Sequence, residues 1–207
     1  MRYADDLVVH CNSQREAEEV LEAIKKRLGE CRLELNEQKT KIVYCKKDHR
    51  KEKYKPVKFD FLGFGFQPRP SLTKEGEIFL GFDCAISRKS EHKIAEIIRK
   101  TRFHRRTDLS IYHIAEFFNP KIRGWLNYYG KFRMNMLMRI FRIFNWRLIK
   151  WAARKYKRFK RSMYKAGDWL RNLAKCYPGL FIHWQYGFGT AKSYVKQEQY
   201  DGRLSRT

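Results

Sequence analysis

Two adjacent carboxylates, Asp5 and Asp6, stand near the start of the 207-residue sequence and could hold a metal ion. Neighbouring carboxylates repel each other, and a divalent cation between them removes that repulsion. The residues that follow, Leu7-Val8-Val9, favour a buried strand. The sequence therefore predicts a β-hairpin whose turn presents the two acids to a divalent metal.

A helix is expected directly after this hairpin. Ser13 and Glu16 have the spacing of a capping box, Gly29 marks the end, and Glu22 and Lys26 are placed to pair on the outer side. The apolar positions recur at helical spacing and predict one face packed on a sheet. They are Ala17, Val20, Leu21, Ile24 and Leu28.

Short strands are expected in the rest of the first segment. Two lie around residues 32–35 and 41–44, and the charged stretch 46–58 predicts a solvated loop. Residues 59–64 and 78–82 then predict a hairpin with residues 73–76 as its turn.

The basic charge is concentrated in the second segment. The chain has 46 Lys and Arg against 22 Asp and Glu, a net charge of +24. Residues 86–165 contain 23 of these basic residues and only four acidic ones. Such an excess indicates a polyanionic partner, with nucleic acid the leading class. Composition and periodicity together predict a domain boundary near residue 85.

The second segment predicts three or four helices. Apolar stripes begin near Ile94 and Ile111, and Asn119-Pro120 predicts a further helix start, with Asn as N-cap and Pro in the first helical position. The longest stripe has six apolar positions on a 3.6-residue period. These are Leu137, Ile140, Phe141, Phe144, Leu148 and Trp151.

Six cations lie on the opposite side of this longest helical pattern: Arg139, Arg147, Lys150, Arg154, Lys157 and Arg161. A solvated face is the ordinary explanation of a charged stripe, and an anionic membrane surface is another. Almost no acids interrupt the stripe, which favours contacts with the phosphates of a polyanion.

Composition also excludes several classes of protein. The five cysteines are far apart, so neither a zinc site nor a disulfide framework is indicated. No apolar run approaches membrane-spanning length. The expected location is the cytoplasm, in a bacterial cytosol or nucleoid, or an organelle.

Five sequence blocks resemble the group II intron reverse transcriptase/maturase family. Tyr3-Ala4-Asp5-Asp6 resembles the Y/F-x-D-D box, and Leu33-x-Leu35-x-x-x-Lys39-Thr40 the block that follows it. Phe61-Leu62-Gly63-Phe64 resembles the primer grip. Residues 119–130, NPKIRGWLNYYG, and 178–184, PGLFIHW, resemble signatures of the maturase, or thumb, domain.

The resemblance implies an α+β chain with three parts. Residues 1–85 would be the C-terminal part of a reverse transcriptase palm, residues 86–189 an all-α maturase/thumb domain, and residues 190–207 a disordered polar tail. The family's fingers and most of its palm precede the Y-x-D-D box, including a strand with another metal-binding aspartate. We therefore expect the C-terminal portion of a longer polymerase: a split or degenerate reading frame, an assembly fragment, or a subunit completed by an N-terminal reverse transcriptase half as partner. No copying activity is expected from this chain by itself.

The resemblance also implies roles for single residues. Asp5 would bridge the two Mg²⁺ of nucleotidyl transfer, Asp6 would support it, and Tyr3 would lie against the template–primer. Lys39 would stand near the leaving pyrophosphate of a dNTP, although a surface lysine in a turn is the alternative. Phe61, Leu62, Gly63 and Phe64 would hold the primer end, although Phe61 and Leu62 are equally consistent with core packing.

Two functions remain open from the sequence. The chain is either part of an RNA-directed DNA polymerase that also binds group II intron RNA, or a non-catalytic RNA-binding maturase module. The residues expected to bind RNA are Lys121, Arg123, Lys131, Arg139, Arg147, Lys150, Arg154, Lys157 and Arg161. Trp125, Tyr128 and Tyr129 could stack on bases, although core packing is favoured for Trp125 and Tyr129. His183 is expected to have a packing or capping role.

Overall fold

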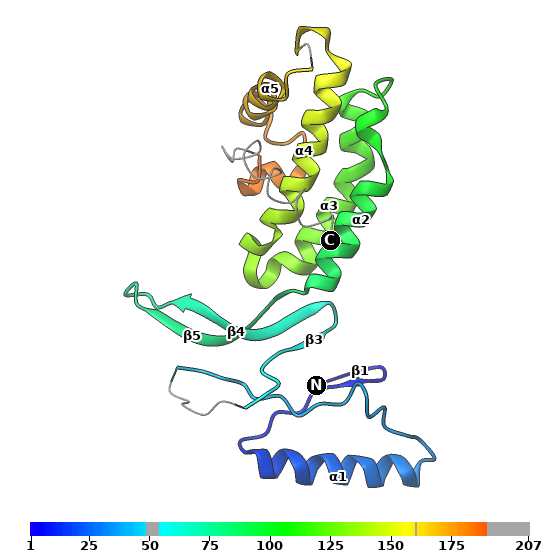
Figure 1. Cartoon of the computed structure of the whole chain (residues 1–207), viewed down its shortest axis with the longest axis vertical. Helices are drawn as coiled ribbons and strands as arrows, with labels where there is room; N and C mark the ends of the chain where they lie inside the picture. Colours follow the sequence, from blue (N-terminus) through cyan, green and yellow to red (C-terminus); the bar gives the residue numbers. More distant parts are fainter. Residues whose placement is uncertain (49–53, 160, 190–207) are drawn as a thin grey trace, which may run out of the picture. The chain divides into compact units, whose positions relative to one another are not determined.

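The computed structural model describes residues 1–48, 54–159 and 161–189, and the chain divides into two compact units, Met1–Cys84 and Ala85–Thr207 (Figure 1). The first unit contains nearly all of the strands and the second most of the helices. The predicted α+β class, with a partial palm followed by a helical domain, is confirmed. The tail predicted at residues 190–207 lies outside the described residues.

The first unit begins with the predicted hairpin, whose strands are β1 (Arg2–Tyr3) and β2 (Asp6–Leu7). Helix α1 (Gln14–Glu30) follows, with the side chain of Ser13 accepting the amide of Glu16 at 3.1 Å. The predicted capping box is incomplete, because the carboxylate of Glu16 accepts the amide of Asn12 and not that of the N-cap Ser13. The apolar stripe is half-buried, and α1 has no buried residue.

Two details of α1 differ from the sequence predictions. Glu22 forms its ion pair with Lys25, not with Lys26. The helix continues to Glu30, because the left-handed residue that ends it is Arg32 (φ 56°), not Gly29. The amide of Leu33 donates to the carbonyl of Leu28, and that of Arg32 to the carbonyl of Gly29, which is the Schellman pattern.

The strands predicted around residues 32–35 and 41–44 are absent from the described structure. Strand residues must exchange backbone hydrogen bonds with a neighbouring strand, and neither segment pairs with one. Residues 36–40 instead form a turn in which the Asn36 side chain accepts the Lys39 amide.

A three-stranded sheet in the order β3-β4-β5 completes the first unit. Its strands are β3 (Phe59–Phe61), β4 (Phe64–Leu72) and β5 (Ile78–Ile86). The predicted hairpin was wrong in one respect, because residues 59–64 are not a single strand. Leu62 and Gly63 both have positive φ, at 48° and 80°, and form a two-residue turn between β3 and β4. The predicted turn at residues 73–76 joins β4 to β5.

The second unit is helical and has one core. Its longer helices are α2 (Arg88–Lys100), α3 (Ile111–Arg133), α4 (Met138–Lys155) and α5 (Met163–Cys176). Single 3₁₀ turns lie between and after them: η1 (Phe103–Arg105), η2 (Met134–Leu137), η3 (Lys157–Phe159) and η4 (Ile182–Tyr186). Ser87, Ser110 and Ser162 each cap the N-terminus of a helix, because a serine oxygen accepts an amide that has no partner inside the helix.

Asn119-Pro120 does not begin a helix, contrary to prediction. Both residues lie inside α3, which runs without a break from Ile111. The Asn119 side chain donates to the carbonyl of Leu180 at 3.0 Å and accepts the amide of Ile182 at 3.1 Å. Asn119 therefore fixes the closing segment of the unit to α3 instead of capping a helix.

Helix α4 forms the centre of the second unit, packing against α2 and α5 (Figure 1). All six positions of the predicted apolar stripe, Leu137 at the end of η2 and five in α4, are inaccessible to solvent, with 0% exposure. None of the helices in the described residues is both long and apolar enough to cross a membrane.

Candidate functional site

The two carboxylates lie where the hairpin turns. Asp6 is opposite Tyr3 in the β1–β2 register, and Ala4 and Asp5 form the turn, with Ala4 at φ 48°. The amino group of Met1 donates to the carbonyl of Val8 at 2.7 Å, and the amide of Val8 donates back at 2.8 Å. These two bonds extend the short ladder and hold the turn that presents the acids.

The acidic pair is suited to part of a Mg²⁺ site. Asp5 and Asp6 are exposed, and within the described ranges neither carboxylate has a hydrogen bond or an ion pair. Protein Mg²⁺ sites commonly use one or two carboxylates together with water and substrate phosphates. Across residues 1–48, 54–159 and 161–189, no group of three or more His, Cys, Asp or Glu is close enough to form a complete protein site.

The other residues predicted for catalysis are also exposed. Tyr3 is 63% exposed on β1, beside the turn. Lys39 lies in the turn at residues 36–40, where its amide is bonded to Asn36. No hydrogen bond or ion pair between described residues joins the Lys39 ammonium to Asp5 or Asp6.

The block compared with the primer grip forms the β3–β4 turn. Phe61 and Phe64 are cross-strand partners, and both side chains are buried. Leu62 and Gly63 are the half-buried turn residues between them. The buried pair Phe61 and Phe64 thus flanks the Leu62-Gly63 turn, which lies at the end of strands β3 and β4.

In the second unit, cations gather around His104, and we call His104, Arg105, Arg147, Lys150 and Arg154 the His104 centre. Nη1 of Arg147 lies 2.8 Å from Nδ1 of His104, and Nη1 of Arg154 donates to the His104 carbonyl at 3.0 Å. Burial and the charges of Arg147, Arg154, Lys150 and Arg105 lower the pKa of His104 to about 4. A guanidinium only donates, so Nδ1 of His104 accepts and the ring is neutral at pH 7.

The loop before α3 is fixed to α4 by similar bonds. Nζ of Lys155 donates to the carbonyls of Thr107 and Leu109 at 2.7 and 2.8 Å, and Nε1 of Trp151 donates to that of Arg106 at 3.1 Å. The cationic side of α4 is therefore partly covered, and Arg147 and Lys150 are half-buried instead of fully solvated.

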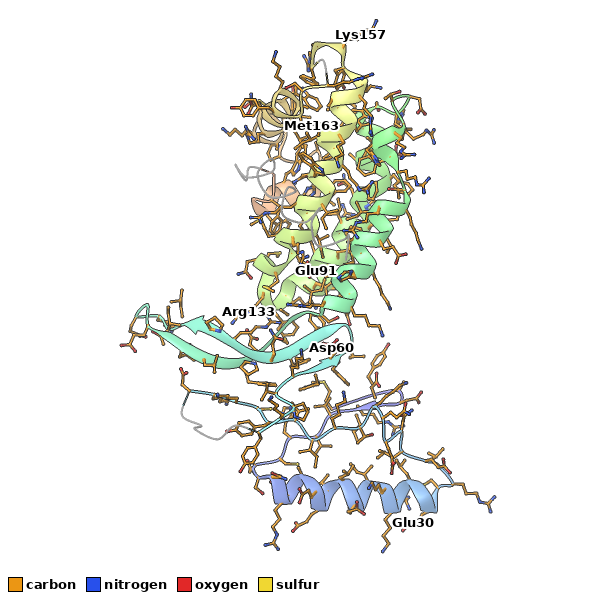
Figure 2. All side chains as sticks on the ribbon, in the orientation of Figure 1. Glu30, Asp60, Glu91, Arg133, Lys157 and Met163 are labelled. Carbon is orange, nitrogen blue, oxygen red and sulfur yellow. The ribbon has the colours of Figure 1, made fainter. Side chains whose placement is uncertain are left out.

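The remaining predicted cations of the α4 pattern lie outside the His104 centre. Arg139 forms an ion pair with Glu91 of α2 at 3.4 Å, so an acid does face this stripe. Lys157, in η3, is exposed and its side chain points away from the helices (Figure 2). Arg161 is exposed and has a positive φ of 60°.

The predicted cations on α3 are separated from one another. Nζ of Lys121 lies 3.5 Å from the centre of the Phe117 ring, and Lys131 is exposed near the helix end. Arg123 lines a hollow beside η4. Tyr128 is 48% exposed, whereas Trp125 and Tyr129 pack partly against the core.

His183 belongs to a buried polar cluster. Its Nε2 lies 2.9 Å from Oδ1 of Asn145, which also accepts Nε1 of Trp184 at 3.2 Å, and Nδ2 of Asn145 donates to the Phe188 carbonyl at 2.7 Å. His183 is stacked on Phe141, and burial lowers its pKa to about 3. His183 therefore packs in the core, as the sequence predicted.

Two features of the site were missed by sequence reasoning. His104 has a visible signal, because the segment Arg102-Phe103-His104-Arg105-Arg106 is strongly basic. The hollow beside Arg123 has no such signal, since its walls come from segments about sixty residues apart.

Two known protein families match the chain, one in each of its two units. The family model of reverse transcriptase (RNA-dependent DNA polymerase) matches residues 1–66, which contain the acidic hairpin. The family model of the group II intron maturase-specific domain matches residues 91–168, which contain the His104 centre. Neither a curated protein nor a solved structure matches the chain significantly.

Together the two matches define an intron-encoded protein with reverse transcriptase and maturase domains. The two matches support a group II intron reverse transcriptase/maturase. Such proteins have RNA and other nucleic acids as partners, and reverse transcriptases generally use a divalent metal.

Proposed function

We propose that the second unit binds group II intron RNA through the His104 centre. The supporting observation is the low pKa of His104, which burial and four neighbouring cations bring to about 4. A proton is disfavoured on that ring partly because the local potential is positive, and the same potential attracts phosphates. Arg105, Lys150 and Arg154 contribute charge, and Arg105 and Arg154 are exposed.

A salt titration of RNA binding tests this proposal. The triple variant Arg105→Gln, Lys150→Gln, Arg154→Gln should bind intron RNA more weakly, because fewer counterions are released. The slope of log affinity against log salt should fall by about 2, at roughly 0.7–0.9 for each phosphate that the protein no longer neutralises.

The matched control removes the same charge from the exposed side of α2. Lys89→Gln, Lys93→Gln and Arg99→Gln together should change the slope by less than half as much. Equal slopes in the two triple variants would mean that binding depends on net charge alone, and an unchanged slope in the first would exclude the His104 centre.

We also propose that the hairpin acids take part in RNA-directed DNA synthesis within a larger assembly. Asp5 and Asp6 would hold Mg²⁺, which stabilises the charge that develops on the phosphates during nucleotidyl transfer. Tyr3 would contact the template–primer, Phe61–Phe64 would support the primer end, and Lys39 would approach the phosphates of the dNTP. A further carboxylate would come from an N-terminal reverse transcriptase half, in the same polypeptide or in a separate one.

Substitution of the two acids separates the proposed roles. In an assembly reconstituted with that N-terminal half, Asp5→Asn with Asp6→Asn should abolish primer extension, while affinity for intron RNA stays within about twofold. Retained extension would exclude the metal-binding assignment. If extension is absent with the native acids as well, the chain is better described as a non-catalytic RNA-binding maturase module.

A further inference from the structure

A hollow of about 390 Å³ lies between α3 and the closing segment of the second unit. Its size falls in the range of small-molecule sites, about 300–1,000 Å³. One wall is the α3 face bearing Arg123, Leu126 and Asn127, and the other is formed by Ile182, Gln185 and Tyr186 of η4.

The two walls are held in fixed positions by Asn119. Its side chain amide donates to the Leu180 carbonyl and accepts the Ile182 amide, so both of its hydrogen-bonding ends are used between the walls. Leu126 is 4% exposed and supplies an apolar surface inside the hollow. The hollow is thus built into the tertiary structure and not formed by a surface loop.

Four exposed polar side chains line the hollow. The side chains of Arg123, Asn127, Gln185 and Tyr186 have no hydrogen bond or ion pair with another described residue. Tyr186 is 51% exposed, which leaves its ring accessible beside the opening.

We propose that this hollow binds one unpaired nucleotide of the RNA. The amides of Asn127 and Gln185 each offer donors and an acceptor, which match the edge of a nucleobase. The Tyr186 ring offers a stacking surface, Leu126 and Ile182 contact the apolar face of the base, and Arg123 binds the adjoining phosphate. A base inside a duplex cannot enter, because its edge and both faces are already occupied.

This inference rests on the proposed RNA binding and adds a preference for single-stranded segments. The His104 centre offers charge, and contacts with phosphates do not recognise unpaired bases. Loss of the side chains that line the hollow should therefore weaken binding of single-stranded RNA and leave binding of duplex RNA unchanged.

The experiment compares a single-stranded RNA with a fully paired RNA duplex of the same length, using the full chain. Tyr186→Ala should weaken single-strand binding about tenfold, as expected for loss of one stacked base. Asn127→Ala with Gln185→Ala should weaken it by a similar factor, and duplex affinity should stay within about twofold in each case. Tyr186→Phe should retain the affinity, because the ring remains.

Two controls separate folding and electrostatic effects from the pocket. Tyr112→Ala removes an exposed tyrosine from the start of the same helix and should change neither affinity. Arg123→Gln should lower the salt slope for single strands by about 1, whereas Tyr186→Ala should not change it. Thermal melts of each variant identify any that fail to fold. If Tyr186→Ala is among them, the affinities of Tyr186→Phe for the two RNAs are compared with those of the native chain.

If single-strand and duplex affinities fall together in Tyr186→Ala, or if neither falls, the nucleotide pocket is excluded while RNA binding by the His104 centre stands. If the native chain binds neither RNA, the proposed function itself fails. Competition by free mononucleotide at the same site, without any single-strand preference, would assign the hollow to a soluble nucleotide and overturn the RNA proposal.

Discussion

Two histidines of the second unit have lowered pKa values for different physical reasons. His183 is fully buried, and loss of hydration alone brings its pKa to about 3. His104 is partly accessible, and neighbouring cations add to burial in bringing its pKa to about 4. The pKa of His183 therefore reflects burial in the core, and that of His104 also reflects the positive potential of the neighbouring cations.

The His183 ring predicts acid sensitivity of folding. The folded-state pKa of His183 is below the unfolded value of about 6.5. Between these two pH values the unfolded chain binds a proton on His183 and the folded chain does not. Stability from this group is complete above pH 6.5 and falls as the pH drops toward 3, by about 1.4 kcal/mol for each pH unit. His183→Gln keeps a donor for Asn145 and should lose that slope in urea titrations between pH 6.5 and 4.5.

Phe181→Leu serves as the control for the His183 measurement. Phe181 is also completely buried and contacts the His183 ring, but it does not titrate. This variant should lose stability by a similar amount at every pH and keep the native slope. An unchanged slope in His183→Gln would show that the acid sensitivity comes from other groups.

At the scale of elements, the end of α2 contains a conformation that glycine would adopt more easily. Arg102 has φ 47° in the left-handed position after the C-cap Thr101, and its side chain is exposed. Arg102→Gly should raise the free energy of unfolding by about 1 kcal/mol, because a side chain is disfavoured there. Chemical denaturation of the two proteins measures the difference.

The same substitution three residues earlier should have the opposite sign. Arg99 is exposed within α2, where glycine costs about 1 kcal/mol through lower helix propensity. A loss of stability in both variants would mean that the Arg102 side chain is more important than its backbone strain.

Local patterns predicted several elements correctly, because each depends on neighbouring residues. The acidic hairpin, the serine cap of α1 and the apolar stripe of α4 all have this character. Asn119-Pro120 was misassigned because its local pattern is that of a helix start, while Asn119 is bonded to a segment more than sixty residues away. The strands predicted at 32–35 and 41–44 failed because pairing requires a partner strand.

The candidate site divides in the same way. The acids of the hairpin and the cations Arg147, Lys150 and Arg154 could be selected by type and spacing. Their arrangement around His104 depends on a contact across 43 residues, which no periodicity displays. The hollow between α3 and η4 is likewise a product of tertiary packing.

At the scale of the whole molecule, the two units differ greatly in burial. Helix α1 has no buried residue, and its apolar stripe is only half-buried. Helix α4 has nine buried residues in its 18 positions. Because buried apolar area is the main source of stability, the two units should open with very different free energies.

Hydrogen exchange of the intact chain tests this difference. Amides in the middle of α4 should exchange roughly a thousandfold more slowly than those in the middle of α1, since only the former require the core to open. Mass spectrometry of peptides from Gln14–Glu30 and Met138–Lys155 provides the comparison. Equal protection would show that the first unit has a stabilising environment that the burial pattern does not reveal.

The double use of α4 has a consequence for how the sequence can drift over generations. One side of the helix fills the interior, and on the other Arg147, Arg154 and Lys155 bind the segment between α2 and α3. Most amino-acid substitutions in α4 should therefore lower stability, whereas most substitutions in α1 should not. A complete substitution scan scored by selection should therefore show α4 as the most intolerant stretch of the chain.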